Sequence, residues 1–353
     1  MPKNTTFFSK KLILWYLQNG RNLPWRETRD PYHIWLSEII LQQTRVAQGM
    51  PYYLKFTETF PTVYELARAP EEKVLKLWQG LGYYSRARNL HFTAQTIVDK
   101  YEGVFPNNYK ELLSLKGVGD YTASAIGSIC FDLPTAVVDG NVYRVLSRVF
   151  GIDTPINSVA GIKEFKELAQ LLIDEKQPGT FNQAAMEFGA RHCTPQNPDC
   201  DSCIFNTHCE ARLQTRVDSL PVKLQKNKIK THYYNYIVPI YNGTTFLEQR
   251  TGKGIWQQLY QFPLVESPKE MNTKKLEGLS EYQTLKEKFG IEEITLFNTE
   301  TIVHKLSHKH LHTRFWIAEA SAVENGIEFS EVEKYPVPIL IGNFIQAFGA
   351  FHG

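Results

Sequence analysis

The sequence predicts a helical domain followed by an α+β domain, with a short basic segment between them. The chain has 353 residues, more than one ordinary domain contains. Apolar residues recur at helical spacing through residues 1–211, whereas residues 232–353 contain β-branched and aromatic runs with a hairpin signal at Asn242-Gly243. We therefore expect domains at 1–211 and 232–353, joined by a linker at 212–231.

Composition narrows the classes of function. The hydrophobic fraction of 42% suffices for buried cores and excludes a disordered chain, and the formal net charge of +2 does not by itself indicate nucleic-acid binding. Positive charge is nevertheless concentrated in residues 212–232, where Asp218 is the only acidic residue. The basic residues of this segment are Arg212, Arg216, Lys223, Lys226, Lys228 and Lys230. Such a segment can follow a phosphate backbone, and a solvated linker explains it equally well.

The sequence shows neither a secretory signal nor a membrane span. The apolar run at residues 12–17 is short and lies between polar residues, and no run is long enough to cross a bilayer. In such a chain, clustered cysteines indicate metal ligation rather than disulfides. Four of the five cysteines have the spacing Cys193-x6-Cys200-x2-Cys203-x5-Cys209. Four thiolates at this spacing can hold either zinc or a four-iron cluster.

The first helices of the chain carry a candidate acid. Asp30-Pro31 has the residues of a helix start, with Asp as N-cap and Pro at the first helical position. Glu38 lies in the helix that follows, YHIWLSEIILQQTRV, among mostly apolar neighbours. A carboxyl in such surroundings has a raised pKa and can act as a general acid near neutral pH, whereas most glutamates in the middle of a helix are simply solvated.

A glycine-rich turn and a glycine hairpin follow further helices, which we expect at residues 62–68, 70–78, 84–101 and 109–115. In GLGYYSRARN, Gly80 and Gly82 bracket Leu81, which we expect to be exposed beside aromatic and arginine side chains that suit contact with bases. Core packing explains one of the two tyrosines equally well. In residues 115–148, Gly117-Val118-Gly119 precedes a helix whose free amides favour a phosphate.

Asp139, in VVDGNV, is an isolated acid about twenty residues beyond this hairpin. A phosphate-binding hairpin followed by such an acid indicates chemistry on a nucleic acid. The alternative is a helix–turn–helix with a solvated aspartate. Helices are expected around residues 162–176 and 181–191, before the cysteines.

The C-terminal part is expected to be α+β. Strands are predicted in HYYNYIVPIY and in the segment at residues 299–320, with helices at 281–289 and 342–348. His304, His308, His310 and His312 are concentrated in the second strand segment. Without an acidic or cysteine partner nearby, surface positions on strands are favoured over a metal site.

Several motifs, in order, resemble the MutY-type adenine DNA glycosylases of the helix–hairpin–helix glycosylase superfamily. They are LPWR at residues 23–26, SEIILQQTRV at 37–46, GLGYYSRARNL at 80–90, LKGVGDYTASAI at 115–126, VVDGNVYRV at 137–145, and the cysteine spacing. The resemblance covers essentially the whole chain. It implies an all-α helix–hairpin–helix glycosylase domain with two lobes, one bearing an iron–sulfur cluster, followed by an α+β nudix-like domain.

The resemblance also assigns roles to residues. Glu38 matches the acid that protonates a flipped adenine, and Asp139 matches the second carboxylate. The hairpin Gly117, Val118 and Gly119 would hold a phosphate, with Arg26, Gln43, Leu81 and Tyr83 as further DNA contacts. Cys193, Cys200, Cys203 and Cys209 match the ligands of a [4Fe–4S] cluster.

The implied reaction is consistent with general chemistry. A base inside a duplex must be flipped out before it is cleaved. A protonated carboxyl improves the leaving group and an ionised one stabilises the oxocarbenium ion, as in glycoside hydrolysis. We expect Glu38 to protonate adenine N7 and Asp139 to stabilise the cation, supported by hydrogen bonds from Tyr121 and Asn141. Bifunctional relatives carry a lysine where this chain has Tyr121, so a monofunctional glycosylase is expected.

The nudix-like domain is expected to bind rather than to hydrolyse, because its characteristic run of carboxylates is missing. The family's Phe-Ser-His loop, which recognises 8-oxoguanine, corresponds to Leu306-Ser307-His308. The expected substrate is therefore duplex DNA with adenine opposite 8-oxoguanine or guanine. We expect a monomer in the cytoplasm of a bacterium-like cell, associated with the nucleoid. The alternatives are an endonuclease III-like lyase and a non-catalytic iron–sulfur DNA-binding protein.

Overall fold

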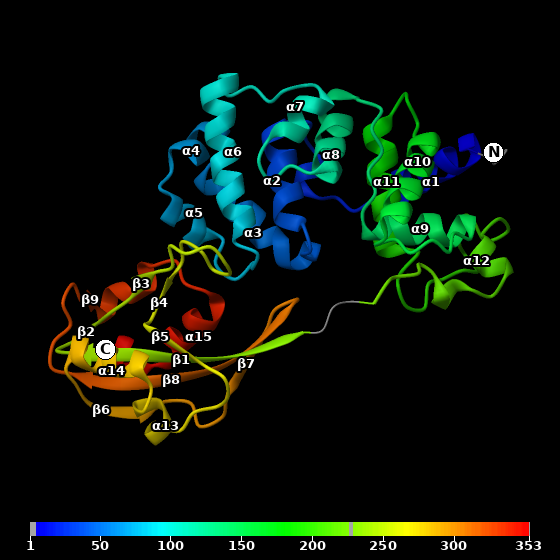
Figure 1. Cartoon of the computed structure of the whole chain (residues 1–353). Coiled ribbons are helices and arrows are strands. Elements are labelled where there is room, and N and C mark those ends of the chain that lie inside the picture. The colour runs from blue at the N-terminus through cyan, green and yellow to red at the C-terminus, as the bar shows by residue number, and fades with distance from the viewer. Residues whose placement is uncertain (1–4, 226–228, 353) are drawn as a thin grey trace. The chain divides into compact units, whose positions relative to one another are not determined.

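The computed structural model describes residues 5–225 and 229–352, which form two compact units (Figure 1). Unit 1 consists of two stretches of chain, the first ending at Arg68 and the second running from Asn89 to Gln225. Unit 2 consists of Ala69–Arg88 and the chain beyond Gln225. This division differs from the predicted boundaries, because residues 69–88 belong to unit 2 and residues 212–225 to unit 1.

Hydrogen bonds explain both differences. Arg88 donates to the carbonyl of Gln257 at 2.7 Å, and Lys76 donates to the carbonyl of Tyr335 at 3.2 Å, so residues 69–88 are held by the C-terminal part of the chain. Arg212 pairs with Asp201 at 2.9 Å inside unit 1. Of the predicted basic linker, Lys226 and Lys228 lie outside the described residues.

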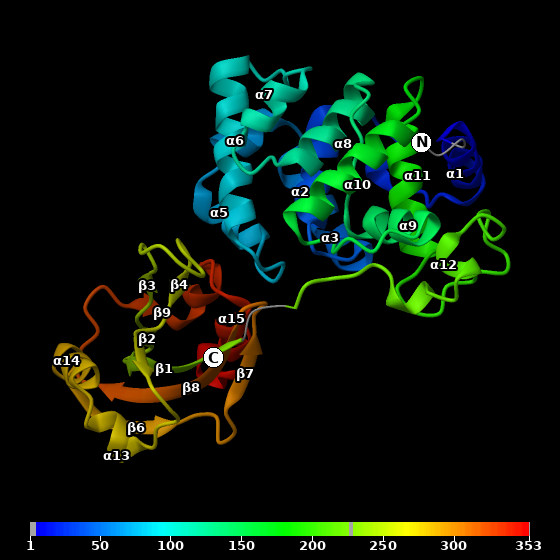
Figure 2. The ribbon, with the colours of Figure 1, turned by 45° about the vertical axis from the view of Figure 1, so that its right-hand side comes forward.

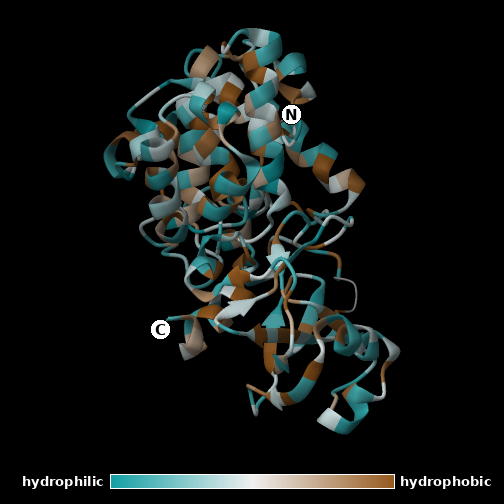
Figure 3. Ribbon diagram, turned by 90° about the vertical axis from the view of Figure 1, so that its left-hand side faces the viewer, coloured by the Kyte–Doolittle hydropathy of each residue, from teal (hydrophilic) through white to brown (hydrophobic). Residues whose placement is uncertain are grey.

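Unit 1 is helical, as the sequence predicts. Hydrophobic and hydrophilic positions alternate along its helices, as expected where one face is buried (Figure 3). Its elements are α1 (Thr5–Asn19), η1 (Pro24–Arg26), α2 (Pro31–Leu41), α3 (Val46–Thr59), α4 (Val63–Arg68), most of α6 (Ser85–Tyr101), α7 (Tyr109–Ser114), α8 (Asp120–Phe131), α9 (Gly140–Phe150), α10 (Val159–Leu172), α11 (Pro178–Arg191), α12 (Glu210–Leu213) and η2 (Val217–Ser219).

One hydrophobic core of unit 1 joins the first helix to helices from the middle of the chain. Phe8 and Leu12 of α1 pack with apolar residues of α9, α10 and α11 and with Cys209. Helix α11 is central, because it packs against α1, α8 and α9. Its approach to α8 is close: a Cβ on Gly179 would lie 2.8 Å from the backbone oxygen of Ser128. Helix α11 therefore fixes the positions of α8 and α9 relative to each other.

Unit 2 is built on a mixed sheet. Its strands have the order β6-β8-β1-β2-β9, with β5 paired to β1 and β7 paired to β8. The long central strands β1 and β8 run parallel and side by side (Figure 2). The strands of unit 2 are β1 (Lys230–Tyr241), β2 (Thr244–Thr245), β3 (Glu248–Gln249), β4 (Tyr260–Gln261), β5 (Leu264–Ser267), β6 (Ile291–Leu296), β7 (Ile302–Lys305), β8 (Lys309–Ala320) and β9 (Ile327–Glu328). Of these, β3 and β4 pair with each other in a separate two-stranded sheet.

The helices and the hairpin of unit 2 agree with the sequence. Asn242 and Gly243 both have positive φ and join β1 to β2, as the Asn-Gly signal predicts. The remaining elements are α5 (Glu71–Leu77), α13 (Thr273–Glu277), α14 (Ser280–Phe289), η3 (Phe329–Lys334), α15 (Ile339–Ala347) and η4 (Gly349–Phe351). Among the described residues, no helix is both long and apolar enough to cross a membrane.

Candidate active site

Glu38 is held in a buried stretch of α2. The helix begins where Asp30 accepts a hydrogen bond from the amide of Tyr32 at 2.8 Å, and Glu38 is only 9% exposed. Burial raises the pKa of Glu38 to about 7, with a smaller rise from the negative charge of Asp139; a hydrogen bond with Tyr121 and the charge of Arg26 act in the opposite direction. Glu38 can therefore both hold and release a proton near neutral pH.

Tyr121 interacts with Glu38 from the first turn of α8. Its hydroxyl also donates to Sδ of Met186, on α11, at 3.3 Å. Burial raises the pKa of Tyr121 well above its usual value, and the charges of Glu38 and Asp139 raise it further. The phenol therefore stays neutral and keeps its proton available for a hydrogen bond.

Asp139 is the N-cap of α9. Its Oδ1 accepts from the amides of Asn141 and Val142 at 2.9 and 2.8 Å, and its Oδ2 accepts from the side-chain amide of Asn141 at 2.7 Å. The pKa of Asp139 is raised, because burial outweighs these three hydrogen bonds and the charge of Arg144, which lower it. The expected support of Asp139 by Asn141 is thus present.

Arg144 joins this group to the first cysteine. It donates to Oδ1 of Asn141 at 2.9 Å, to the carbonyl of Gly189 at 2.6 Å and to the carbonyl of Cys193 at 2.7 Å. The side chain that supports Asp139 is therefore linked through one guanidinium to the backbone of the cysteine segment.

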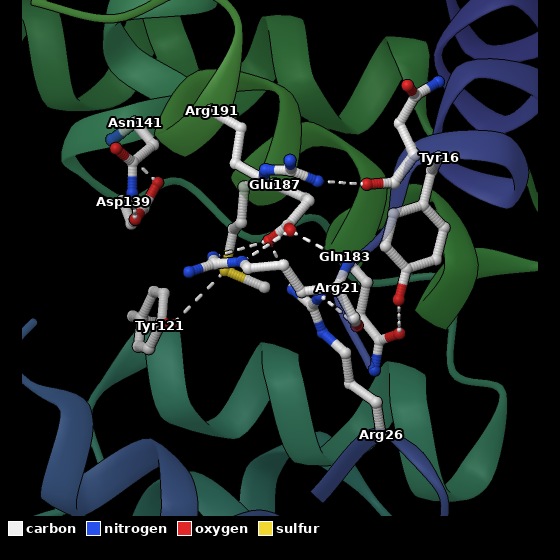
Figure 4. Close-up of polar contacts among 11 residues, drawn as sticks. Tyr16, Arg21, Arg26, Tyr121, Asp139, Asn141, Gln183, Glu187 and Arg191 are labelled. Carbon is white, nitrogen blue, oxygen red and sulfur yellow. Dashed lines mark hydrogen bonds and ion pairs between the residues drawn. The ribbon is translucent and has the colours of Figure 1, made fainter. Parts of the chain in front are cut away.

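A third carboxyl, Glu187 of α11, is buried in an ion-pair cluster (Figure 4). Its side chain has no exposed surface and accepts from Nε of Arg21 at 2.7 Å and from Arg26 at 2.9 Å. Burial raises the pKa of Glu187, but the hydrogen bonds from Arg21 and Arg26 outweigh it and lower the pKa to about 2. Arg26, predicted as a DNA contact, is thus engaged by Glu187, and its side chain is 12% exposed.

The hairpin before α8 has a backbone conformation at Gly117 that favours glycine. Gly117 has φ +80°, and a Cβ there would lie 2.8 Å from Cβ of Asn89, so a side chain is excluded on both grounds. A Cβ on Gly119, the N-cap of α8, would meet no atom within 4 Å, which leaves open space beside this residue. As a glycine, Gly119 has no side chain with which to cap the helix. The negative charge of Asp120, next to the hairpin, is balanced by Nζ of Lys166 at 2.9 Å.

Other predicted DNA contacts lie on tight turns. Gln43 is exposed and follows α2 with φ 58°. In unit 2, Tyr83 is 49% exposed with φ 48°, whereas Leu81 is only 6% exposed. The expectation of an exposed Leu81 is wrong, because the left-handed residues at Gly80, Gly82 and Tyr83 turn this segment so that Tyr83, rather than Leu81, is presented.

The four clustered cysteines line one pocket of unit 1. Arg148, Phe188 and His192 also line it, and no disulfide joins these thiols. Arg148 reaches Sγ of Cys193 at 3.5 Å and also donates to the carbonyl of Thr194 at 2.7 Å. Within residues 5–225 and 229–352, no group of three or more His, Cys, Asp or Glu side chains is arranged to hold a single metal ion. The four cysteines that line this pocket would supply the all-sulfur donor set that iron–sulfur clusters take.

The predicted recognition loop connects β7 and β8 in unit 2. The amide of Leu306 donates to the carbonyl of Lys309 at 2.8 Å, which closes the turn. Ser307 and His308 are exposed, and their side chains lie 3.3 Å apart between Oγ and Nδ1. Leu306 is half-buried, so the two polar side chains are the ones the turn presents to solvent.

Sequence reasoning missed Arg21, Arg144, Met186 and Glu187. Glu187 had the same signal as Glu38, a lone acid in an apolar helical segment, AAMEFGA. Its partner Arg21 lies 166 residues away, so no local pattern connects the two.

Both parts of the chain resemble known proteins. Residues 36–172 match the HhH-GPD superfamily of base excision DNA repair proteins, and residues 235–347 match the NUDIX domain. An adenine DNA glycosylase of Buchnera aphidicola subsp. Baizongia pistaciae is 37% identical over 321 residues, covering 89% of this chain and 86% of the relative. The adenine DNA glycosylase of Homo sapiens is 45% identical over 224 residues, or 61% of this chain and 41% of the relative.

Solved structures show the same helical fold. A thermostable thymine-DNA glycosylase has a TM-score of 0.56 at 31% identity, covering 60% of this chain and 98% of that one. An endonuclease III in a non-covalent DNA complex has a TM-score of 0.53 at 22% identity, covering 61% of this chain and 98% of that one. The match over most of both chains to the Buchnera relative shows that this chain belongs to the adenine DNA glycosylases, N-glycosyl hydrolases of base excision repair.

Proposed function

We propose that this glycosylase removes adenine mispaired with 8-oxoguanine, using Glu38 and Asp139 as its two catalytic carboxyls. The observation that carries the proposal is the contrast between their environments. Burial raises the pKa of both carboxyls. That of Glu38 rises to about 7, whereas the rise for Asp139 is opposed by three hydrogen bonds that favour its ionised form. One carboxyl is thus suited to donate a proton and the other to remain ionised.

Each carboxyl serves one part of the bond cleavage. Glu38 gives its proton to N7 of the flipped adenine, so the base leaves as a neutral species when the bond from N9 to C1′ breaks. The ionised Asp139 stabilises the positive charge that develops on the sugar. Asp139 then accepts a proton from a water molecule whose oxygen bonds to C1′. The products are free adenine and an abasic site. Tyr121 and Asn141 hold the two carboxyls in place.

Binding of the duplex involves both units. The hairpin of Gly117, Val118 and Gly119 takes a phosphate on its amides, supported by the open space beside Gly119. Gln43 and Tyr83 contact the strands from exposed turns. Arg26, whose charge Glu187 balances, is the further DNA contact that the resemblance implies. Leu81 reaches DNA only if its turn rearranges on binding, because it is buried here.

We assign recognition of the base opposite adenine to unit 2. Ser307 and His308 stand exposed on the turn between β7 and β8 and can hydrogen-bond a purine edge. Both can accept a hydrogen bond, which suits the additional N7–H that distinguishes 8-oxoguanine from guanine. Guanine opposite adenine is the weaker substrate.

The cysteine pocket holds a [4Fe–4S] cluster, with Cys193, Cys200, Cys203 and Cys209 as ligands. Support comes from the four cysteines that line one pocket and from the chemistry of an all-sulfur donor set. Such a cluster would cross-link the cysteine segment. This chain's own Arg148 and Arg144 then tie that segment to α9, which carries Asn141.

The chain releases adenine without cutting the strand. A lyase needs an amine to form a Schiff base with the abasic sugar, and Tyr121 offers a neutral phenol at that position.

A duplex assay separates this function from its alternatives. With adenine opposite 8-oxoguanine, we expect strand breaks only after alkali treatment, since the abasic product is then cleaved chemically. Adenine opposite guanine should react more slowly, and adenine opposite thymine should be left intact. Breaks without alkali would indicate an endonuclease III-like lyase, and the absence of breaks would indicate a DNA-binding protein without catalysis.

Substitution of either carboxyl should slow the release of adenine without weakening DNA binding. We expect Glu38→Gln and Asp139→Asn each to lower the single-turnover rate of adenine release by about 10²-fold to 10⁴-fold, the usual range for loss of a proton-transfer group. In the unsubstituted protein this rate should fall as the pH rises above about 7, because Glu38 then loses its proton. Near-normal release by either variant would remove that residue from the mechanism.

Metal analysis tests the cluster. Purified protein should contain about four iron atoms per chain, and Cys200→Ser should lose them, because a serine oxygen is a poor ligand for such a cluster. Cys130→Ser is the matched control and should keep the iron, since Cys130 is not among the residues lining the pocket. Zinc at one atom per chain, with no iron, would contradict the assignment.

A further inference from the structure

The segment that connects α8 to α9 runs through residues 132–139 and ends at Asp139. It forms no strand with any other segment, yet Ala136 and Val137 are completely or almost completely buried. Buried backbone groups need hydrogen-bond partners. Here most of the partners are side chains, and they come from α10 and α11.

Two amide side chains pair with this segment as a neighbouring strand would. Asn182 of α11 donates to the carbonyl of Thr135 at 2.8 Å and accepts from the amide of Val137 at 2.9 Å. Gln170 of α10 donates to the carbonyl of Pro134 at 2.7 Å and accepts from the amide of Ala136 at 3.1 Å. Each side-chain amide bonds the backbone carbonyl of one residue and the backbone N–H of the residue two positions later, as a residue of a parallel strand does.

A lysine adds a further hydrogen bond to this segment and links the segment to α8, the helix that follows the glycine hairpin. Lys166, one turn before Gln170 on α10, donates to the carbonyl of Ala136 at 2.6 Å and to Oγ of Ser124 on α8 at 3.1 Å. Asn182 likewise donates to Oγ of Ser128 on α8 at 2.8 Å. The same side chains therefore hold both the segment and the helix that carries Tyr121.

We propose that Gln170, Asn182 and Lys166 are positioning residues that set the place of Asp139 relative to Glu38 and Tyr121. The proposal rests on the catalytic role proposed above for Asp139. The segment fixes the backbone immediately before Asp139, and the hydrogen bonds from Asn141 and Val142 fix its carboxylate on the other side. A small displacement of a catalytic group has a large effect on rate, so loosening the segment should slow the chemical step more than DNA binding.

Gln170 is the best probe, because it is exposed and its replacement leaves no buried cavity. Gln170→Met removes both hydrogen bonds, and Gln170→Glu keeps an acceptor for the amide of Ala136. Glu167→Met, one turn away on the same helix, is the matched control, since Glu167 pairs with Lys163 and does not bond the segment. Lys166 is a poor probe because its loss would also leave Asp120 unbalanced beside the hairpin.

The test compares single-turnover adenine release with affinity for the same duplex. We expect Gln170→Met to release adenine about 10-fold more slowly with DNA affinity unchanged, because misplaced catalytic groups lower rate rather than binding. Gln170→Glu should recover part of the rate, and Glu167→Met should match the unsubstituted protein. Asn182→Ala should show the same pattern more strongly wherever its thermal unfolding remains cooperative.

A double-mutant cycle distinguishes positioning from general destabilisation. In an Asp139→Asn background, Gln170→Met should change the residual rate by less than about 2-fold, because residues that act through one group are non-additive. Equal losses in both backgrounds, or a Gln170→Met rate equal to that of Glu167→Met, would overturn the proposal. A near-normal rate for Asp139→Asn alone would instead overturn the proposed role of Asp139.

Discussion

Burial of three carboxyl groups within unit 1 is the constraint on which the rest of the site depends. Each is accommodated differently: Glu38 has a raised pKa of about 7, Asp139 is held by three hydrogen bonds at the start of α9, and Glu187 is paired with Arg21 and Arg26. The ion pairs of Glu187 help to keep the pKa of Glu38 high. Arg26 lowers the pKa of Glu38, and Glu187 compensates the charge of Arg26 and its neighbour Arg21. Proton donation by Glu38 near neutral pH thus depends on the ion pairs that Glu187 of α11 makes with Arg21 and Arg26.

Helix α11 brings these groups together. It packs against α1, α8 and α9, and it supplies Asn182 to the connecting segment, Met186 to Tyr121, and Glu187 to the arginines. Gly179 permits the close contact with α8 that these interactions require. The rigidity of the helical scaffold is therefore the source of the catalytic geometry, since the carboxyls come from helices α2 and α9, whose relative position α8 and α11 determine.

The sequence predicted the parts of this site that depend on local patterns. Glu38 among apolar neighbours, the glycines of the hairpin and the cysteine spacing are all visible in short windows, as are most helices and the Asn242-Gly243 hairpin. The pairing of Glu187 with Arg21 and of Gln170 with Ala136 was not, because these partners are distant in the chain and meet only in the fold. Leu81 was expected to be exposed because glycines bracket it, but three left-handed residues determine the direction of that turn. The grouping of residues 69–88 with unit 2 depends on contacts with residues near 257 and 335, which no composition shift marks.

The most direct test of this account is the titration of Glu38 itself, followed by the ¹³C chemical shift of its side-chain carboxyl in the DNA-free protein. We expect a midpoint near pH 7, with the proton retained below it because burial disfavours the charged form. The Asp139→Asn variant should titrate at lower pH, because one of the negative charges that raise the pKa of Glu38 is then absent. A midpoint near 4.5, the ordinary value for glutamate, would contradict the claim that the fold prepares Glu38 as an acid.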